Sequence, residues 1–181
     1  MASRGGSVLI ASRTQEKLDS AAKEIRLAVP TVQLITRVLD ASDETAVQAF
    51  GAELDAQEHQ WDALICTAAG KAPHGPIGQL PTSDTAALFA SKFWTAHNSC
   101  KHIAPRLTDG GAVALTAGVL NRRPGLNCSP LAAVNGALEL ILILTLIFTL
   151  TLTQIQTPNP NQARSRGSHA HSRSSSGRGC G

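Results

Sequence analysis

The sequence of 181 residues contains no tyrosine, only four phenylalanines and two tryptophans, and a single methionine. A hydrophobic core must therefore be built from Ala, Leu, Ile and Val, which are typical of close-packed α/β layers. A hydrophobic fraction of 43% with 16% charged residues excludes a collagen, a coiled coil and a wholly disordered chain. The absence of tyrosine also removes one common proton donor from any active site.

Cysteines are few, and the four present are widely spaced, without a CxxC motif: Cys66, Cys100, Cys128 and Cys180. None has a set of Cys and His at zinc spacing nearby, so the sequence predicts no metal site. The N-terminal stretch has only a short apolar run that ends at Arg13, which predicts no signal peptide. We therefore expect packed thiols and a reducing, cytoplasmic location.

Acidic residues are absent from residues 158–181, which contain four arginines. The remaining 12 of the 16 Lys and Arg residues stand against 13 acids, so the body of the chain is near neutral. A Ser/Gly/Arg-rich segment with few apolar residues is typical of a disordered tail. A solvated tail is favoured over one that contacts nucleic acid or acidic lipid, and no specific nucleic-acid partner is predicted.

An uncharged segment follows Glu139, where residues 140–152 repeat Leu, Ile and Thr. These 13 residues are fewer than the roughly 20 that a membrane-spanning helix needs. A buried continuation of the preceding helix is favoured over membrane association and over a transmembrane helix. The sequence thus predicts a folded domain over residues 1–139, a low-complexity apolar segment over 140–157 and a disordered tail over 158–181.

Short β-rich runs alternate with amphipathic stretches over the first 135 residues, which is typical of βαβ units and a parallel sheet. Strands are predicted at residues 8–12, 32–39, 62–67 and 112–116, and helices at 15–27, 43–58, 82–107 and from about 131. Gly110 and Gly111 are expected to break the long third helix. This order of elements predicts an α/β fold with four parallel strands.

Ligands of open α/β sheets bind outside the carboxyl ends of the strands, so the residues that follow each strand are candidates for a site. The candidates for a cofactor site are Ser12, Arg13, Asp40, Ala68, Ala69, Gly70 and Thr116. An arginine after the second strand of a dinucleotide fold can bind the 2′-phosphate of NADP, whereas an acid there selects NAD. Arg13 therefore indicates NADP if this fold forms, and a solvated turn arginine is the alternative.

Two other candidates each leave two interpretations open. Asp40 could accept a hydrogen bond from the adenine amino group, or it could cap the helix that follows. The small residues of the turn Ala68–Gly70 allow close approach of a flat ribose or adenine. Alternatively, they only form a tight turn at the end of the strand.

Seven segments in this order resemble the short-chain dehydrogenases/reductases: GGSVLIASRTQEKL, VLDASDETAVQAF, DALICTAAG, FASKFWTAHNSCKHIAPRL, GGAVALTAGV, RRPG and LAAVNGALE. The resemblance covers roughly residues 7–140 and implies a Rossmann-like parallel sheet with helices on both faces. It also implies NADP(H)-linked oxidoreduction of a small carbonyl or alcohol substrate. On this resemblance Arg13 would hold the 2′-phosphate, Asp40 would face the adenine, and Ala68–Gly70 would lie along the adenosine.

The sequence departs from the family pattern in the parts that bind phosphate and transfer protons. It starts at what would be the second strand, so the first βα unit and its TGxxxGxG phosphate loop are absent. Gly5 and Gly6 precede a strand instead of opening a helix, so they do not replace that loop. The positions of the catalytic Asn, Ser, Tyr and Lys of the family correspond here to Lys92, Ala117 or Gly118, Leu131 and Asn135.

No catalytic residue is assigned from the sequence. Lys92 on the third predicted helix is better explained as a snorkelling or solvated lysine than as a replacement acid. His97 and His102 on the same helix are better explained as surface or packed histidines. We expect an oxidoreductase-like protein whose activity is impaired or lost. The alternatives are a non-catalytic nucleotide-binding or interaction module and a membrane-associated protein attached through residues 140–152, and a homo-oligomer stays open.

Overall fold

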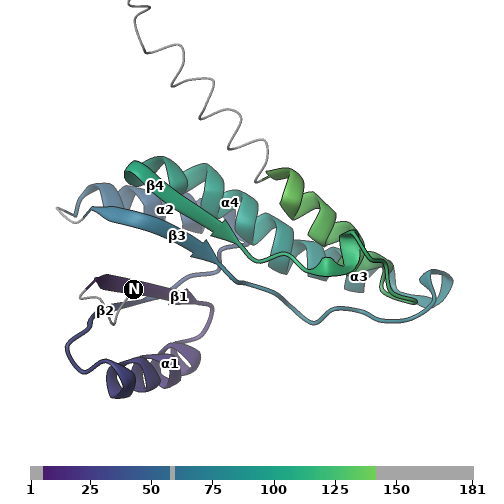
Figure 1. Ribbon diagram of the computed structural model, residues 1–181, viewed down its shortest axis with the longest axis horizontal. Coiled ribbons are helices and arrows are strands. Elements are labelled where there is room, and N and C mark those ends of the chain that lie inside the picture. Colours follow the sequence, from purple (N-terminus) through teal and green to yellow (C-terminus); the bar gives the residue numbers. More distant parts are fainter. Residues whose placement is uncertain (1–5, 58–59, 142–181) are drawn as a thin grey trace, which may run out of the picture. The chain divides into compact units, whose positions relative to one another are not determined.

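The computed structural model describes residues 6–57 and 60–141, which fall within the unit Met1–Leu142. The strands are β1 (Ser7–Ser12), β2 (Gln33–Val38), β3 (Trp61–Cys66) and β4 (Leu107–Leu115), and the helices are α1 (Gln15–Ala28), α2 (Glu44–Asp55), α3 (Thr82–Phe89) and α4 (Thr95–His102) (Figure 1). A further helix covers residues 129–141. The apolar segment predicted beyond residue 141 and the tail predicted at 158–181 lie outside the described residues.

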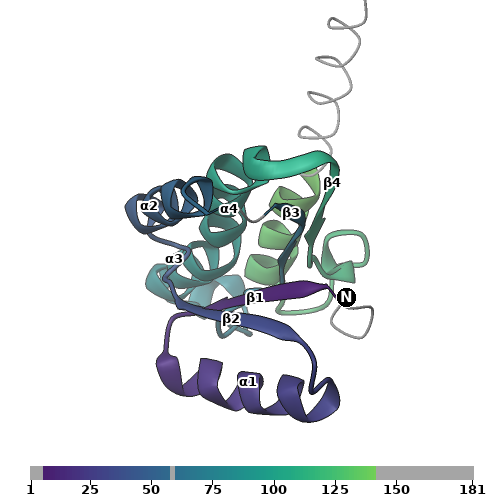
Figure 2. The same cartoon turned by 90° about the vertical axis from the view of Figure 1, so that its left-hand side faces the viewer.

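Helix α1 forms because its apolar side chains recur about one turn apart on a single face. Leu18 and Ala22 on this face are buried, and the helix lies against β1 and β2. Figure 2 shows α1 on one side of β1 and β2, with α2 and α4 on the other side. The predicted arrangement of helices on both faces of a parallel sheet is therefore confirmed for this pair of strands.

Helix α2 begins after Asp43, whose carboxylate accepts hydrogen bonds from the backbone N–H groups of Thr45 and Ala46 at 2.9 and 3.3 Å. An aspartate at this position satisfies N–H groups that have no partner within the helix. One face of α2 buries Val47, Phe50 and Leu54, and these side chains pack with Ile103 in one core cluster. Here this cluster is called the helix-layer core. It is defined as Val47, Phe50, Leu54 and Ile103.

The four strands form two parallel pairs, β1 with β2 and β3 with β4. No ladder joins β1 to β3 within the described residues, so the expected set of four parallel strands is correct in direction but is split into two sheets. The physical reason is that strand propensity is local, whereas lateral pairing depends on which backbone edges come together.

The long helix predicted over residues 82–107 is interrupted. It consists of α3, a π-helical turn at Ala90–Trp94 and α4, which ends at His102. A short 3-10 turn at Ala104–Arg106 then leads directly into β4. Pro105 explains the end of the helix, because proline lacks the N–H that would continue the ladder.

Gly110 and Gly111 lie inside β4 instead of ending a helix, which corrects the prediction made for them. The register between β3 and β4 shifts here, since Trp61 pairs with Leu107 but Ala63 pairs with Ala112. Gly110 has φ of +79°, a left-handed conformation that glycine adopts without steric cost. The two glycines thus allow an irregularity of the β-bulge type in β4.

Among the described residues no helix is both long enough and apolar enough to cross a membrane. The segment at residues 140–152, considered from the sequence as a membrane attachment, lies mostly outside the described residues.

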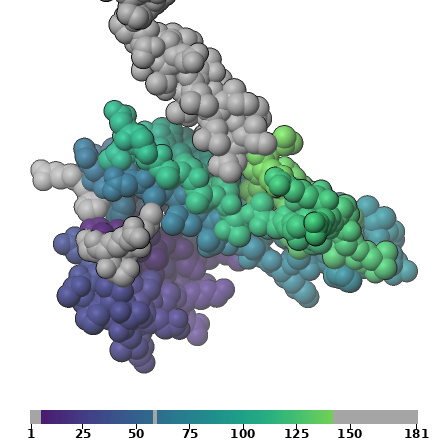
Figure 3. Space-filling view, in the orientation of Figure 1, coloured from purple at the N-terminus to yellow at the C-terminus, as the bar shows by residue number. Residues whose placement is uncertain are grey.

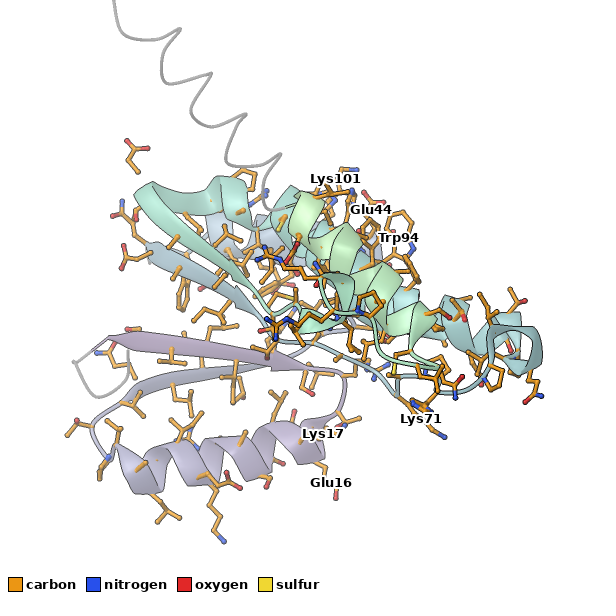
Figure 4. The ribbon with its side chains drawn as sticks, turned by 45° about the vertical axis from the view of Figure 1, so that its right-hand side comes forward. Glu16, Lys17, Glu44, Lys71, Trp94 and Lys101 are labelled. Atoms are coloured by element: carbon orange, nitrogen blue, oxygen red, sulfur yellow. The ribbon has the colours of Figure 1, made fainter. Side chains whose placement is uncertain are left out.

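An exposed ion-pair group joins the start of α2 to the end of α4. The Nζ atom of Lys101 and the Nε2 atom of His102 lie 2.6 and 3.0 Å from Oε1 of Glu44, and Figure 4 shows Lys101 and Glu44 beside each other. The hydrogen bonds from Lys101 and His102 lower the pKa of Glu44 from 4.5 to about 2. Because the pKa is lowered in the folded chain, the stabilisation is fully present above pH 4.5 and is lost as pH falls toward 2.

We predict that Glu44→Gln lowers the thermal unfolding midpoint slightly at pH 7, because the pair is exposed. The difference from the wild-type protein should shrink between pH 4.5 and about 2, as followed by circular dichroism. Glu24→Gln on the exposed side of α1 is the control. A difference that stays constant over this pH range would contradict the assignment to Glu44.

Candidate functional site

A cavity of about 550 Å³ reaches the carboxyl ends of β1 and β3. Five of the seven predicted cofactor residues line it, namely Ser12, Arg13, Asp40, Ala68 and Ala69. Gly70 and Thr116 are not among the lining residues. The fold therefore gathers most of the predicted cofactor residues around one cavity, and their contact with a cofactor stays a prediction.

Asp40 follows β2 and forms a local turn with Ser42. Its Oδ1 atom accepts hydrogen bonds from the backbone N–H of Ser42 at 3.0 Å and from Ser42 Oγ at 2.6 Å. These hydrogen bonds, together with the nearby Arg13 guanidinium, lower the pKa of Asp40. Asp43, not Asp40, caps α2, so the interpretation of Asp40 as a helix cap is wrong. The carboxylate is ionised at neutral pH, exposed, and beside the cavity.

The turn after β3 passes close to the π-helical turn. A Cβ atom at Gly70 would lie 3.0 Å from Cβ of Ser91, so this position has no room for a larger residue. Thr116 instead extends the pairing of β3 with β4, because its N–H donates to the carbonyl of Cys66 at 3.0 Å. Gly70 and Thr116 therefore shape the strand ends, while Ala68 and Ala69 face the cavity.

The π-helical turn places Lys92 in the interior. Lys92 is 7% exposed, and its Nζ atom donates a hydrogen bond to Oδ1 of Asn135 at 2.7 Å. Burial lowers the pKa of the Lys92 ammonium. The expectation of a solvated or snorkelling lysine is wrong, because the side chain is buried and its ammonium is bound to Asn135.

Asn135 is the buried partner in this contact. It is 1% exposed, and its Nδ2 atom has no hydrogen-bond partner among the described residues. A Cβ atom at Gly118 would lie only 2.7 Å from Nδ2, so the amide lies directly against the loop that follows β4. Lys92 stands at an Asn position and Asn135 at a Lys position of the resembled family, and this reciprocal exchange could have indicated that the two side chains touch.

The two histidines of this region have structural contacts outside the cavity. The ring of His97 stacks on Phe93 with centroids 5.9 Å apart, and it meets Trp94 edge-on at 5.3 Å. His102 contacts Glu44, as described above. These contacts account for both rings as packed or ion-paired groups.

Three free cysteines lie in the described residues, Cys66, Cys100 and Cys128. Cys66 lines the cavity, and burial raises the pKa of its thiol. Burial, with the nearby Cys66, raises the pKa of Cys100 to about 11. Neither thiol is thus an activated nucleophile at neutral pH. The described part of the chain holds no cluster of three or more His, Cys, Asp or Glu residues arranged for a metal ion.

A family model described as enoyl-(acyl carrier protein) reductase matches residues 1–142. This range includes every described element and all of the cavity. The chain belongs to the short-chain dehydrogenase/reductase family. It is therefore related to oxidoreductases, and its parallel strands with helices on both faces agree with the Rossmann-like fold of solved members.

The similar proteins cover this chain only in part. Human retinol dehydrogenase 12 is 43% identical over 65 residues, which are 36% of this chain and 21% of that protein. The mouse protein of the same name is 34% identical over 97 residues, which are 54% of this chain and 28% of that protein. The chain thus spans between a fifth and a third of the length of these curated relatives.

Two solved structures show the same relationship. A small-chain dehydrogenase in complex with NADPH has 29% identity and a TM-score of 0.59, and the match covers 75% of this chain and 61% of that one. A xylitol dehydrogenase bound to NAD⁺ has 19% identity and a TM-score of 0.71, over 77% of this chain and 54% of that one. The second similarity shows the fold alone.

We predict that Lys92 and Asn135 are energetically coupled. Asn135→Ala should destabilise the protein by about 2 kcal/mol, because it leaves a buried ammonium without its acceptor. Lys92→Met should cost about 1–2 kcal/mol by leaving the Asn135 carbonyl oxygen unpaired. The double variant should be less destabilised than the two losses added together, with a coupling of about 1 kcal/mol in urea unfolding. Strict additivity would contradict the coupling.

The same contact predicts a dependence on pH. Because the pKa of Lys92 is lowered from 10.5, the folded chain binds fewer protons than the unfolded chain between the lowered pKa and 10.5. The unfolding free energy of the wild-type protein should therefore rise relative to that of Lys92→Met as pH increases across this window. Parallel pH profiles for the two proteins would show that Lys92 titrates normally.

Proposed function

We propose that this chain binds NADP(H) through its adenosine side and that its oxidoreduction of a small carbonyl or alcohol is impaired. The observation that carries the cofactor proposal is the position of Arg13, an exposed residue on the loop after β1 that lines the cavity next to Asp40. NADPH, when bound, supplies the hydride for carbonyl reduction.

The residues of the cavity mouth fit the adenosine half of the cofactor. The guanidinium of Arg13 offers paired N–H donors, which suit the 2′-phosphate. The ionised Asp40 is an acceptor for the adenine amino group, and Ala68 and Ala69 have side chains small enough for a flat ring to approach the backbone. Support also comes from the solved relative that is in complex with NADPH.

Impairment is proposed because the positions of the catalytic groups hold other residues. Leu131, half-buried in the helix of residues 129–141, has no titratable group where the family's Tyr would stand. The amine of Lys92 is buried and bound to Asn135. An ammonium in this position can hold the Asn135 side chain, and Lys92 is not a lining residue of the cavity.

Two further interpretations from the sequence stay predictions, namely a cytoplasmic location and a homo-oligomer. The substrate class also stays a prediction, since the matched retinol dehydrogenases share only a minor part of their length with this chain.

We predict that Arg13→Ala weakens the binding of NADPH roughly ten-fold or more, because a charge-assisted contact to phosphate contributes about 1.5–3 kcal/mol. The binding of NADH should change little, since it lacks the 2′-phosphate. Isothermal titration calorimetry with both nucleotides measures this difference. Arg26→Ala, an exposed arginine in the last turn of α1, is the matched control, and equal losses for both nucleotides would contradict the assignment of Arg13.

A second experiment tests impairment separately from binding. The full chain at saturating NADPH should consume no more cofactor than a protein-free control with a panel of small aldehydes and ketones, with retinal included. Binding in calorimetry without turnover agrees with the proposal and identifies a nucleotide-binding module. Turnover that copurifies with the chain would disprove impairment, and absence of both binding and turnover would disprove the cofactor proposal.

A further inference from the structure

Two loops, one after β3 and one after β4, are joined by a backbone hydrogen bond. They consist of residues 71–81 and 118–128. The N–H of Gly75 in the first loop donates to the carbonyl oxygen of Asn127 in the second at 3.0 Å, and Figure 3 shows the atoms of both loops together on the right-hand side. Here the exposed part of residues 71–81 and 118–128 is called the two-loop surface.

The two-loop surface exposes large aliphatic side chains. Leu126 is 87% exposed, more than any other large apolar side chain of the described residues, and Ile77 and Val119 are 76% and 61% exposed. Because Ile77 is two residues from Gly75 and Leu126 precedes Asn127, the hydrogen bond between the loops keeps Ile77 and Leu126 near each other. Single exposed apolar residues are common on protein surfaces, but a group of them on joined loops is typical of an interaction site.

The charged side chains of the same surface are all basic. Lys71, Arg122 and Arg123 are exposed, and Lys71 is labelled in Figure 4. No Asp or Glu occurs in residues 63–83 or 110–138. Arg122 pairs with Glu139 at 3.1 Å but keeps 75% of its side chain exposed, whereas Lys71 and Arg123 form no ion pair with another described residue. The two-loop surface therefore combines aliphatic groups with net positive charge.

This combination identifies the class of partner. No residue of either loop lines the cavity of the candidate site, and small-molecule sites are concave. The apolar centre of a protein interface is depleted of charged residues, whereas here arginines stand beside the aliphatic groups. A lipid surface is fluid, so it accepts separate apolar side chains at its headgroup boundary, and its anionic headgroups attract nearby Lys and Arg.

We propose that the two-loop surface attaches this chain to the surface of an anionic lipid bilayer. Its aliphatic side chains enter the boundary between headgroups and acyl chains, and its three basic side chains contact lipid phosphates and anionic headgroups. This contact differs from the attachment through residues 140–152 that the sequence leaves open. It does not depend on the proposed cofactor.

The test is co-sedimentation of the full chain with vesicles in the absence of nucleotide. The chain should bind vesicles in which phosphatidylserine makes up about a third of the lipid, and it should bind vesicles of phosphatidylcholine alone at least ten-fold more weakly. Ile77→Ser combined with Leu126→Ser should weaken binding to the anionic vesicles at least ten-fold, since two aliphatic side chains no longer leave water. Arg123→Gln should weaken it roughly five-fold. No binding of the wild-type chain to the anionic vesicles would overturn the proposal.

Two neighbouring residues of α1 provide the matched control. Leu27 is 74% exposed, and Arg26 lies in the last turn of the same helix. Arg26→Gln combined with Leu27→Ser removes the same kinds of group from another surface, so this variant should bind the anionic vesicles as the wild-type chain does. An equal loss in this control would overturn the proposal. Unchanged binding of Ile77→Ser with Leu126→Ser would also overturn it, and would assign binding to the segments predicted after residue 139.

Insertion into lipid has a direct readout at residue 126. Leu126→Trp places an indole on the two-loop surface, and Leu27→Trp places one on α1. Bromine atoms on the acyl chains quench only those tryptophans that contact the chains. Leu126→Trp should therefore lose more emission on brominated anionic vesicles than the wild-type protein, and Leu27→Trp should not. Quenching of Leu27→Trp alone, or of neither variant, would disprove insertion of the two-loop surface.

A second copy of this chain is the competing occupant. Sedimentation velocity without vesicles should show no self-association that depends on the two-loop surface. If the chain self-associates as its concentration rises, and Ile77→Ser with Leu126→Ser abolishes this association, the surface is an interface between copies and the proposal is overturned.

Discussion

The packing of α2 against Ile103 is the contact on which both strand pairs depend. Val47, Phe50 and Leu54 project from one side of α2 and form a single apolar surface with Ile103. Leu9 from the first strand pair and Leu64 from the second both pack on this surface. Since no ladder joins β1 to β3 in the described residues, the relative position of the two pairs is fixed by side-chain packing and not by backbone hydrogen bonds.

This arrangement gives the cavity two regions with different chemistry. Its walls between the strand pairs are apolar, whereas its mouth holds Arg13 and Asp40. Both residues follow strands of the same pair, β1 and β2, and that pair also carries α1 on its other face. Arg13 and Asp40 therefore stand on one strand pair, and Ala68 and Ala69, which are proposed to meet the same adenosine, follow a strand of the other pair. The relative position of the two strand pairs, and so the fit of any ligand that touches both, depends on the packing of Leu9 and Leu64 against the helix-layer core.

The sequence predicted the elements well where the signals are local. The apolar periodicity of α1 and the β-branched run of β1 place both elements within a residue or two of their observed bounds. The break at Ala90–Trp94 was missed, because a single π-helical turn interrupts an otherwise α-helical stretch without a clear signal in residue propensities. Likewise, the separation of the strands into two pairs depends on contacts between distant segments.

The candidate site was predicted in part for the same reason. Residues at strand ends are found from strand positions alone, so Arg13, Ala68 and Ala69 were brought to the cavity as expected. The sequence offered Asp40 as a possible cap of α2, whereas the observed cap is Asp43. The two are easily exchanged in a prediction, because both are aspartates near the start of the same helix. The burial of Lys92 was missed because a lysine is rarely buried without a specific partner, and that partner lies 43 residues further along the chain.

The contact of Lys92 with Asn135 also restricts how such a pair can arise by single substitutions. If the ancestral pair had Asn and Lys at the opposite positions, then one order of change passes through two lysines, and two ammonium groups would share a site that is nearly closed to water. The other order passes through two asparagines, which are neutral and can donate and accept at once. Electrostatic repulsion therefore makes the neutral intermediate the accessible route, and the order of two substitutions is set by a single buried hydrogen bond.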